Sequence, residues 1–108
     1  MKYRYSYAYD NLSAAIQVLA SGEGDVRSRL EIAFDSFRVL QIHHFPLGLQ
    51  KDWEWVMKQM TRYGPLNRAN DRELMSPVHH TMIKIKNKTG VKIAKKVVYL
   101  FFQLESDF

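Results

Sequence analysis

Residues 22–40 read GEGDVRSRLEIAFDSFRVL and carry the clearest helix signal in the chain. Asp25 stands where the positive end of a helix dipole favours an acidic side chain. Behind it, apolar residues recur at spacings of three and four, which places them on one stripe of a helix. These residues are Val26, Leu30, Ala33, Phe34, Phe37 and Leu40. We expect this helix to run to about His43 and to stop at Phe45-Pro46, because the residue before a proline leaves helical geometry.

The same periodicity predicts one helix on each side of this segment. The stripe of the preceding helix ends near Ser21-Gly22 and consists of Ala8, Leu12, Ala15, Ile16 and Leu19. Tyrosines alternate before it at positions 3, 5, 7 and 9, and we interpret them as a helix extension or an ordered arm, because no convincing second strand is available to pair with them. The following helix ends at Gly64-Pro65, and its apolar side carries Leu49, Trp53, Val56, Met57 and Met60.

Two more helices are predicted after a polar connection at residues 65–72. Ser76-Pro77 is a typical helix start, since serine caps free N–H groups and proline suits the first helical position. This fourth helix carries Val78, Met82, Ile83 and Ile85 and ends near Asn87. We expect Thr89 to cap the fifth helix. Its predicted core stripe is Val91, Ala94, Val97, Val98, Phe101 and Leu104.

The composition is that of one folded domain. Of the 108 residues, 46% are hydrophobic and 13% aromatic, which argues against intrinsic disorder. The chain has no cysteine, which excludes a disulfide framework, a thiolate metal cluster and a cysteine nucleophile. No transmembrane helix or signal peptide is recognisable, so a cytoplasmic location is expected. The sequence therefore predicts an all-α fold in which residues 1–108 form a single-domain bundle of about five amphipathic helices.

Positive charge is concentrated in one short segment. From Lys84 to Lys96 the chain has six lysines and no acidic residue, which leaves ten basic and eleven acidic side chains elsewhere. Such a cluster can neutralise phosphates of a nucleic acid, and it can equally be a solvated helix face. The candidates for nucleic-acid or polyanion binding are Lys84, Lys86, Lys88, Lys92, Lys95 and Lys96, with Arg68 and Arg72 from the preceding loop. Because no base-reading arginines are recognisable, such binding would be directed at the backbone.

Histidines occur as two adjacent pairs, His43-His44 and His79-His80. Neighbours on a helix point about 100° apart, so one pair alone cannot chelate a metal ion. The sequence contains no His-Glu-x-x-His or Glu-x-x-His pattern. We therefore expect no metal and no other cofactor.

Arg38 and His43 are separated by four residues near the end of the predicted second helix, a spacing that resembles the motif of HEPN-type ribonucleases. The resemblance implies metal-independent RNA cleavage with the motif paired across a dimer. His43 would act as a general acid or base, and Arg38 would stabilise the charge of the phosphorane. In that family a polar residue usually follows the arginine, whereas this chain has Val39.

Two longer segments, GEGDVRSRL at residues 22–30 and KTGVKIAKK at residues 88–96, resemble recurring segments of short uncharacterised bacterial helical proteins. The resemblance covers about the second and fifth predicted helices. It implies a small bacterial protein of the all-α type and no particular activity.

These observations favour a non-catalytic interaction or regulatory protein over an enzyme. Trp55, Phe102 and several tyrosines fall off the predicted core stripes, and such spare aromatics favour self-association as a homodimer or the binding of a protein partner. The first alternative is a nucleic-acid-binding protein that uses the lysines, and the second is a ribonuclease that uses Arg38 and His43. We expect no membrane among the partners.

Overall fold

The structure is a computed structural model that describes residues 3–64, 66–67 and 74–107. In chain order its elements are the 3₁₀ helix η1 (Tyr3–Tyr5), α1 (Ser6–Ser21), α2 (Val26–Phe37), the 3₁₀ helix η2 (Ile42–His44), α3 (Leu47–Met60), β1 (Leu66–Asn67), β2 (Leu74–Met75), α4 (Pro77–Lys84) and α5 (Asn87–Asp107). The prediction of an all-α bundle of about five amphipathic helices is confirmed.

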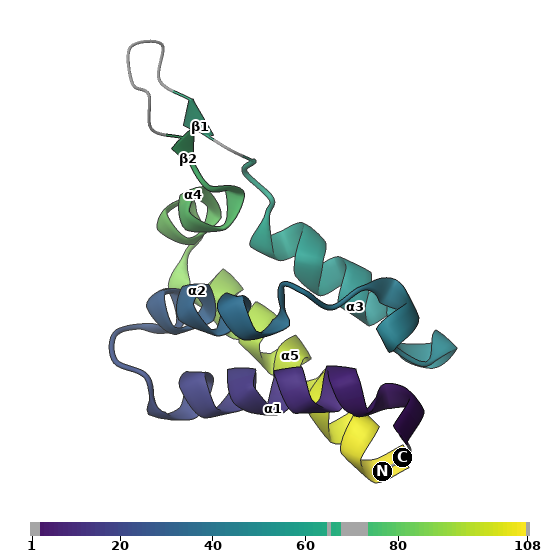
Figure 1. The fold of residues 1–108 in the computed structure, drawn as a ribbon. Helices are drawn as coiled ribbons and strands as arrows, with labels where there is room; N and C mark the ends of the chain where they lie inside the picture. The colour runs from purple at the N-terminus through teal and green to yellow at the C-terminus, as the bar shows by residue number, and fades with distance from the viewer. Residues whose placement is uncertain (1–2, 65, 68–73, 108) are drawn as a thin grey trace.

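The first two helices form an antiparallel hairpin, and α5 packs across both of them (Figure 1). In the turn, Gly24 has a φ of 85°, a left-handed conformation that favours glycine. Asp25 then caps α2, because its Oδ1 accepts the N–H of Ser28 at 3.1 Å. The tyrosine-rich start belongs to η1 and to the first turns of α1, so it is a helix extension, as one of the two interpretations proposed.

Three aromatic side chains form the centre of the core. Phe37, Phe45 and Trp53 are buried, and the rings of Phe45 and Trp53 stack with centroids 4.8 Å apart. The Phe37 ring meets Trp53 edge-on at 5.8 Å. Aromatic pairs at these separations attract each other beyond the effect of burial alone. They join the end of α2 to the residue after η2 and to the middle of α3.

The predicted end of the second helix is wrong. The helix ends at Phe37 and not near His43. After it, the Leu40 N–H bonds to the Phe37 carbonyl, and Gln41 begins the separate turn η2. This path buries both Leu40 and Phe45. On one continuous helix these two side chains, five residues apart, would point about 140° apart and would not share the buried side.

The core side of α5 also differs from the predicted stripe. The buried hydrophobic residues of this helix are Ile93, Val97, Leu100 and Leu104. Of the predicted stripe, only Val97 and Leu104 are fully buried, and Val91 is 41% exposed. The helix begins at Asn87, so Thr89 lies inside its first turn and is not its cap.

The fourth helix starts as predicted. Ser76 Oγ accepts the His79 N–H at 3.1 Å, and Pro77 occupies the first helical position. The helix buries His80 and Thr81, while Ile83, which was predicted on its apolar side, is 53% exposed.

The connection between α3 and α4 contains a feature that the sequence did not predict. Its described parts form a two-stranded antiparallel ladder in which Leu66 pairs with Met75 and Asn67 pairs with Leu74. This short ladder stands beside α4 at one end of the molecule (Figure 1). The predicted binding residues Arg68 and Arg72 lie outside the described residues.

Candidate nucleic-acid interface

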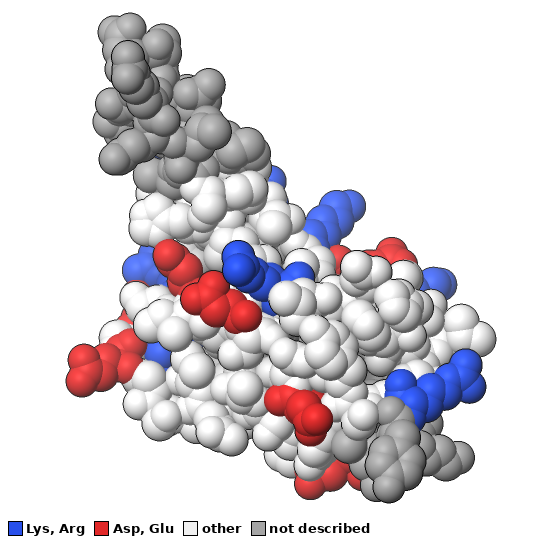
Figure 2. Space-filling model, viewed as in Figure 1, with Lys and Arg blue, Asp and Glu red and all other residues white. Residues whose placement is uncertain are grey.

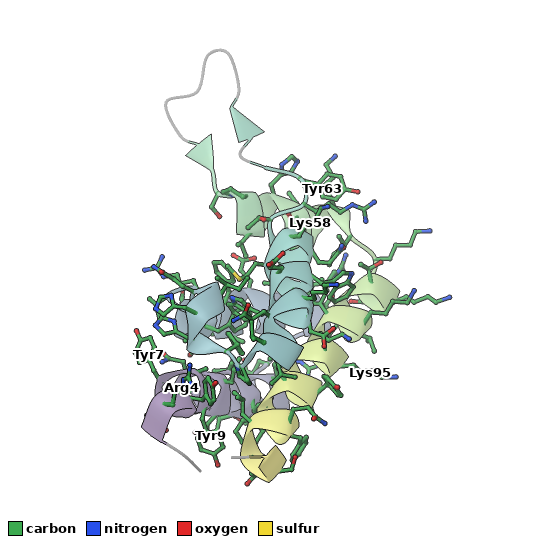
Figure 3. The ribbon with its side chains drawn as sticks, turned by 90° about the vertical axis from the view of Figure 1, so that its right-hand side faces the viewer. Arg4, Tyr7, Tyr9, Lys58, Tyr63 and Lys95 are labelled. Carbon is green, nitrogen blue, oxygen red and sulfur yellow. The ribbon has the colours of Figure 1, made fainter. Side chains whose placement is uncertain are left out.

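Three of the predicted lysines share the outer face of α5. At about 100° per residue, Lys88, Lys92 and Lys95 lie within an arc of about 60°. The buried stripe of the same helix is centred about 140° away. All three lysines are exposed, and Lys95 extends from the outer side of α5 (Figure 3). The amphipathic pattern of α5 therefore presents these cations to solvent.

Two further lysines flank the junction between α4 and α5. Ile85 has extended backbone, with φ −75° and ψ 159°, and its side chain is only 5% exposed. Successive side chains of extended backbone point to opposite sides. Lys86 therefore points away from the core while Ile85 points into it, and Lys84, the last residue of α4, is exposed as well. They continue the run of exposed lysines along the chain towards α4.

The sixth lysine has a different environment. Lys96 Nζ lies 3.1 Å from Asp52 Oδ1, so this ion pair joins α5 to α3. The ammonium group also lies 5.2 Å from the centre of the Tyr99 ring. Both members of the ion pair are about one-third exposed. Lys96 therefore has protein partners, and we place it at the border of the face formed by the other five, which we call the lysine face.

The start of α5 strengthens the positive potential of the lysine face. The first turn of this helix contains no acidic residue. Lys86 and Lys88 instead stand near the helix N-terminus, where the helix dipole is already positive. Over the described ranges, the ion pairs join Asp25 to Arg27, Glu31 to His79 and Asp52 to Lys96, and none involves the lysine face.

The face of the molecule that carries α1 and α2 is mixed in charge. Figure 2, which looks onto α1 and α2, shows acidic and basic side chains interspersed. Outside the five lysines of the lysine face, the sequence has eleven basic and eleven acidic side chains, so the positive excess corresponds to these five.

An aromatic residue that was not predicted to belong to the site lies on the same face. Tyr99 is 45% exposed and stands four residues after Lys95 and seven after Lys92, which places it on the same arc of α5. This helical spacing is the signal that could have revealed it. The ring gives the lysine face a surface on which a planar base can stack.

The four histidines have contacts that stabilise the fold. His44 Nδ1 accepts the Gln41 N–H at 2.8 Å, and its ring lies 4.8 Å from that of Tyr7. Burial, and then the charge of His43, lower the pKa of His44. His43 is exposed, and its ring rests on His44 with centroids 4.1 Å apart. His44 therefore supports the turn η2 as a neutral side chain.

In the second pair, as in the first, one histidine is exposed and the other is more buried. His79 Nδ1 lies 2.9 Å from a Glu31 carboxylate oxygen and joins α4 to α2. His80 is buried, and its Nδ1 donates to the Gly64 carbonyl at 3.0 Å. In the part of the chain that the structure describes, no three His, Cys, Asp or Glu side chains are placed to hold a metal ion.

The structure places Arg38 and His43 in different elements. Arg38 follows the end of α2 and lines a cavity of about 470 Å³ together with Asp35 and Thr61. His43 lies in η2 and is not among the residues that line this cavity. The shared helix on which the ribonuclease hypothesis placed the two residues is absent, because α2 stops at Phe37.

No helix within the described residues combines the length and the hydrophobicity needed to cross a membrane. Comparisons of the chain with protein-family models, with curated proteins and with solved structures found no match.

Proposed function

We propose that this protein is a non-catalytic nucleic-acid-binding protein whose lysine face holds the phosphate backbone of its ligand. One observation carries the proposal: five exposed lysines follow α5 and its junction with α4, and no carboxylate of the described residues pairs with them. A nucleic acid carries condensed counterions along its phosphates. When lysines take the place of these counterions, the counterions are released to solution, and this release favours binding.

The type of side chain supports contacts to phosphates and not to bases. The lysine face contains no arginine among its described residues, and arginine is the side chain whose planar fork recognises guanine bidentately. A lysine acts as a compact point charge that suits a phosphate of any sequence. We therefore expect binding with little sequence preference.

Tyr99 supports a single-stranded ligand. Its exposed ring lies among the lysines, and stacking on an aromatic ring requires a base that is free of its neighbours. Lys88 and Tyr99 are eleven residues apart on one helix, so the part of the face that lies on α5 is about 16 Å long. A strand that follows this face would place phosphates on Lys88 and Lys92 and a base on Tyr99.

The other predictions about function stay predictions. A protein partner bound through exposed aromatics, a location in the bacterial cytoplasm and a ribonuclease with Arg38 and His43 rest on the sequence alone. The proposed binding function needs neither a cofactor nor a reaction.

Fluorescence anisotropy with matched variants tests the proposal. Lys88→Ala/Lys92→Ala removes two charges from the lysine face, and Lys51→Ala/Lys58→Ala removes two charges from exposed positions of α3. With labelled single-stranded RNA, we expect weak binding by the first variant and wild-type binding by the second. Wild-type protein should bind duplex DNA less tightly than single-stranded RNA, because only the single strand can stack on Tyr99.

Two results would contradict the proposal. Equal affinities of the two double variants would show that the lysine face is only a solvated surface. RNA that is recovered shortened by the wild-type protein, but intact with His43→Ala, would favour the ribonuclease hypothesis instead.

A further inference from the structure

A second stripe runs along α5 outside the core. Val91, Lys95, Val98, Phe102 and Glu105 follow one another at spacings of four, three, four and three residues. This is the period of a helix that pairs with another helix along a seam. Val91 is 41% exposed and Phe102 is 55% exposed, whereas Val98 between them is half-buried, so both ends of the apolar part of the stripe face solvent. The helix thus carries one stripe for its own core and another without a partner among the described residues.

One half of this stripe lines an apolar groove. The groove has a volume of about 390 Å³ and lies between α1, α2 and α5, with Ile16, Val26 and Val98 among its lining residues. Its charged lining residues are Arg29 and Lys95. Arg29 is already engaged, because its Nη1 donates to the Leu19 carbonyl at 2.7 Å. Lys95 is therefore the charged lining residue that can form an ion pair with a ligand. The groove suits a ligand that has an apolar group next to an anionic group.

The other half of the stripe presents such a combination. Phe102 and Glu105 are three residues apart, so they are neighbours on one side of α5, and both are exposed. An aromatic side chain and a carboxylate at one end of the stripe therefore complement the apolar groove and the lysine at the other end.

We propose that the partner of this stripe is a second copy of the chain, whose α5 packs antiparallel against the first. In a two-fold pair centred at the level of Leu100, Val98 of each copy faces Phe102 of the other, because both residues are two positions from the centre. Lys95 and Glu105 are each five positions from the centre, so the same register forms an ion pair at both ends. A parallel pair would instead bring Lys95 against Lys95 and Glu105 against Glu105.

This dimer leaves the main cations of the lysine face accessible. The described part of α5 ends at Asp107, which the antiparallel register places opposite Ile93. The described part of the partner's α5 therefore does not reach Lys88 or Lys92. The inference does not depend on nucleic-acid binding: the stripe shares only Lys95 with the lysine face, and the binding test uses Lys88 and Lys92, which lie outside the stripe.

Light scattering coupled to size-exclusion chromatography tests the dimer with a charge swap. We expect wild-type protein to elute with the mass of a dimer. Lys95→Glu and Glu105→Lys should each raise the dimer dissociation constant at least about tenfold, because a symmetric dimer contains each substitution twice. The double variant Lys95→Glu/Glu105→Lys restores opposite charges across the seam and should recover the wild-type mass.

Circular dichroism of each variant distinguishes loss of the dimer from loss of the fold. A wild-type protein that stays monomeric at its highest soluble concentration would overturn the inference. A dimer that persists unchanged in both folded single variants would also overturn it, because the interface would then lie elsewhere. A larger assembly would contradict the closed two-fold arrangement.

Discussion

His44 supports the turn η2 only while its Nδ1 is unprotonated, because that atom accepts the Gln41 N–H. Burial and the nearby charge of His43 lower its pKa in the folded protein from the ordinary value of 6.5. A folded pKa below the unfolded one means that the unfolded chain binds more protons as the pH falls. The contribution of His44 to stability is therefore present above pH 6.5 and is lost as the pH falls towards the folded pKa.

We predict that His44→Asn reduces this dependence on pH. Its side-chain oxygen can still accept the Gln41 N–H, but the group does not titrate. Thermal unfolding of both proteins should show that acidification from neutral pH lowers the melting temperature of the wild type more than that of the variant. Parallel curves for the two proteins would show that His44 does not couple protonation to stability.

Lys88 is a cation at the N-terminal end of α5, where the helix dipole is positive, so its position is electrostatically unfavourable. Lys88→Glu places an acidic group at the N-terminal end of α5 and should stabilise the protein by about 0.3 to 1 kcal/mol while weakening nucleic-acid binding. Lys58→Glu is the matched control, because Lys58 lies in the last turn of α3 and its reversal should destabilise the protein by a similar amount. Urea unfolding measures both changes. Destabilisation by both variants would contradict the dipole argument.

At the level of elements, the existence of all five helices was predictable and their limits were less so. Leu40 fits the stripe of α2 although the helix has ended, because a turn brought it to the same side as Phe37. In α5, apolar residues occupy both the core stripe and the outer stripe, so periodicity could not decide whether Val91 or Ile93 faced the core. Only packing against the other helices makes that choice.

Two glycines in helices should respond to alanine with opposite signs. A Cβ on Gly90 would lie 2.9 Å from Val26 Cγ1 and 3.3 Å from Arg27 Cγ, because α5 approaches α2 closely there. Gly90→Ala should therefore destabilise the protein by about 1 to 2 kcal/mol, despite its better helix propensity. Gly48→Ala meets nothing within 4 Å and should stabilise the protein by up to about 1 kcal/mol. Chemical denaturation measures both, and a stabilising Gly90→Ala would show that the helices separate without cost.

At the scale of the whole molecule, the sequence predicted only those features of the site whose residues are close together in the chain. The lysines are close in sequence, so their clustering could be read directly, and the fold leaves five of them exposed, three on one arc of α5. The pair formed by Lys96 and Asp52 joins positions 44 residues apart, and the groove beside Lys95 is built from three helices. No spacing along the chain reveals such contacts, because they depend on how the helices pack.

The central claim is that the lysine face binds phosphates, and the dependence of binding on salt tests it most directly. We would measure the association constant for single-stranded RNA over a range of salt concentrations. The slope of its logarithm against the logarithm of salt should be less steep by about 1.4 in Lys88→Ala/Lys92→Ala than in the wild type, because each lysine that neutralises a phosphate of a single strand contributes about 0.7 to this slope. Lys51→Ala/Lys58→Ala should keep the wild-type slope. The same slope in all three proteins, or no binding at low salt, would contradict the proposed function.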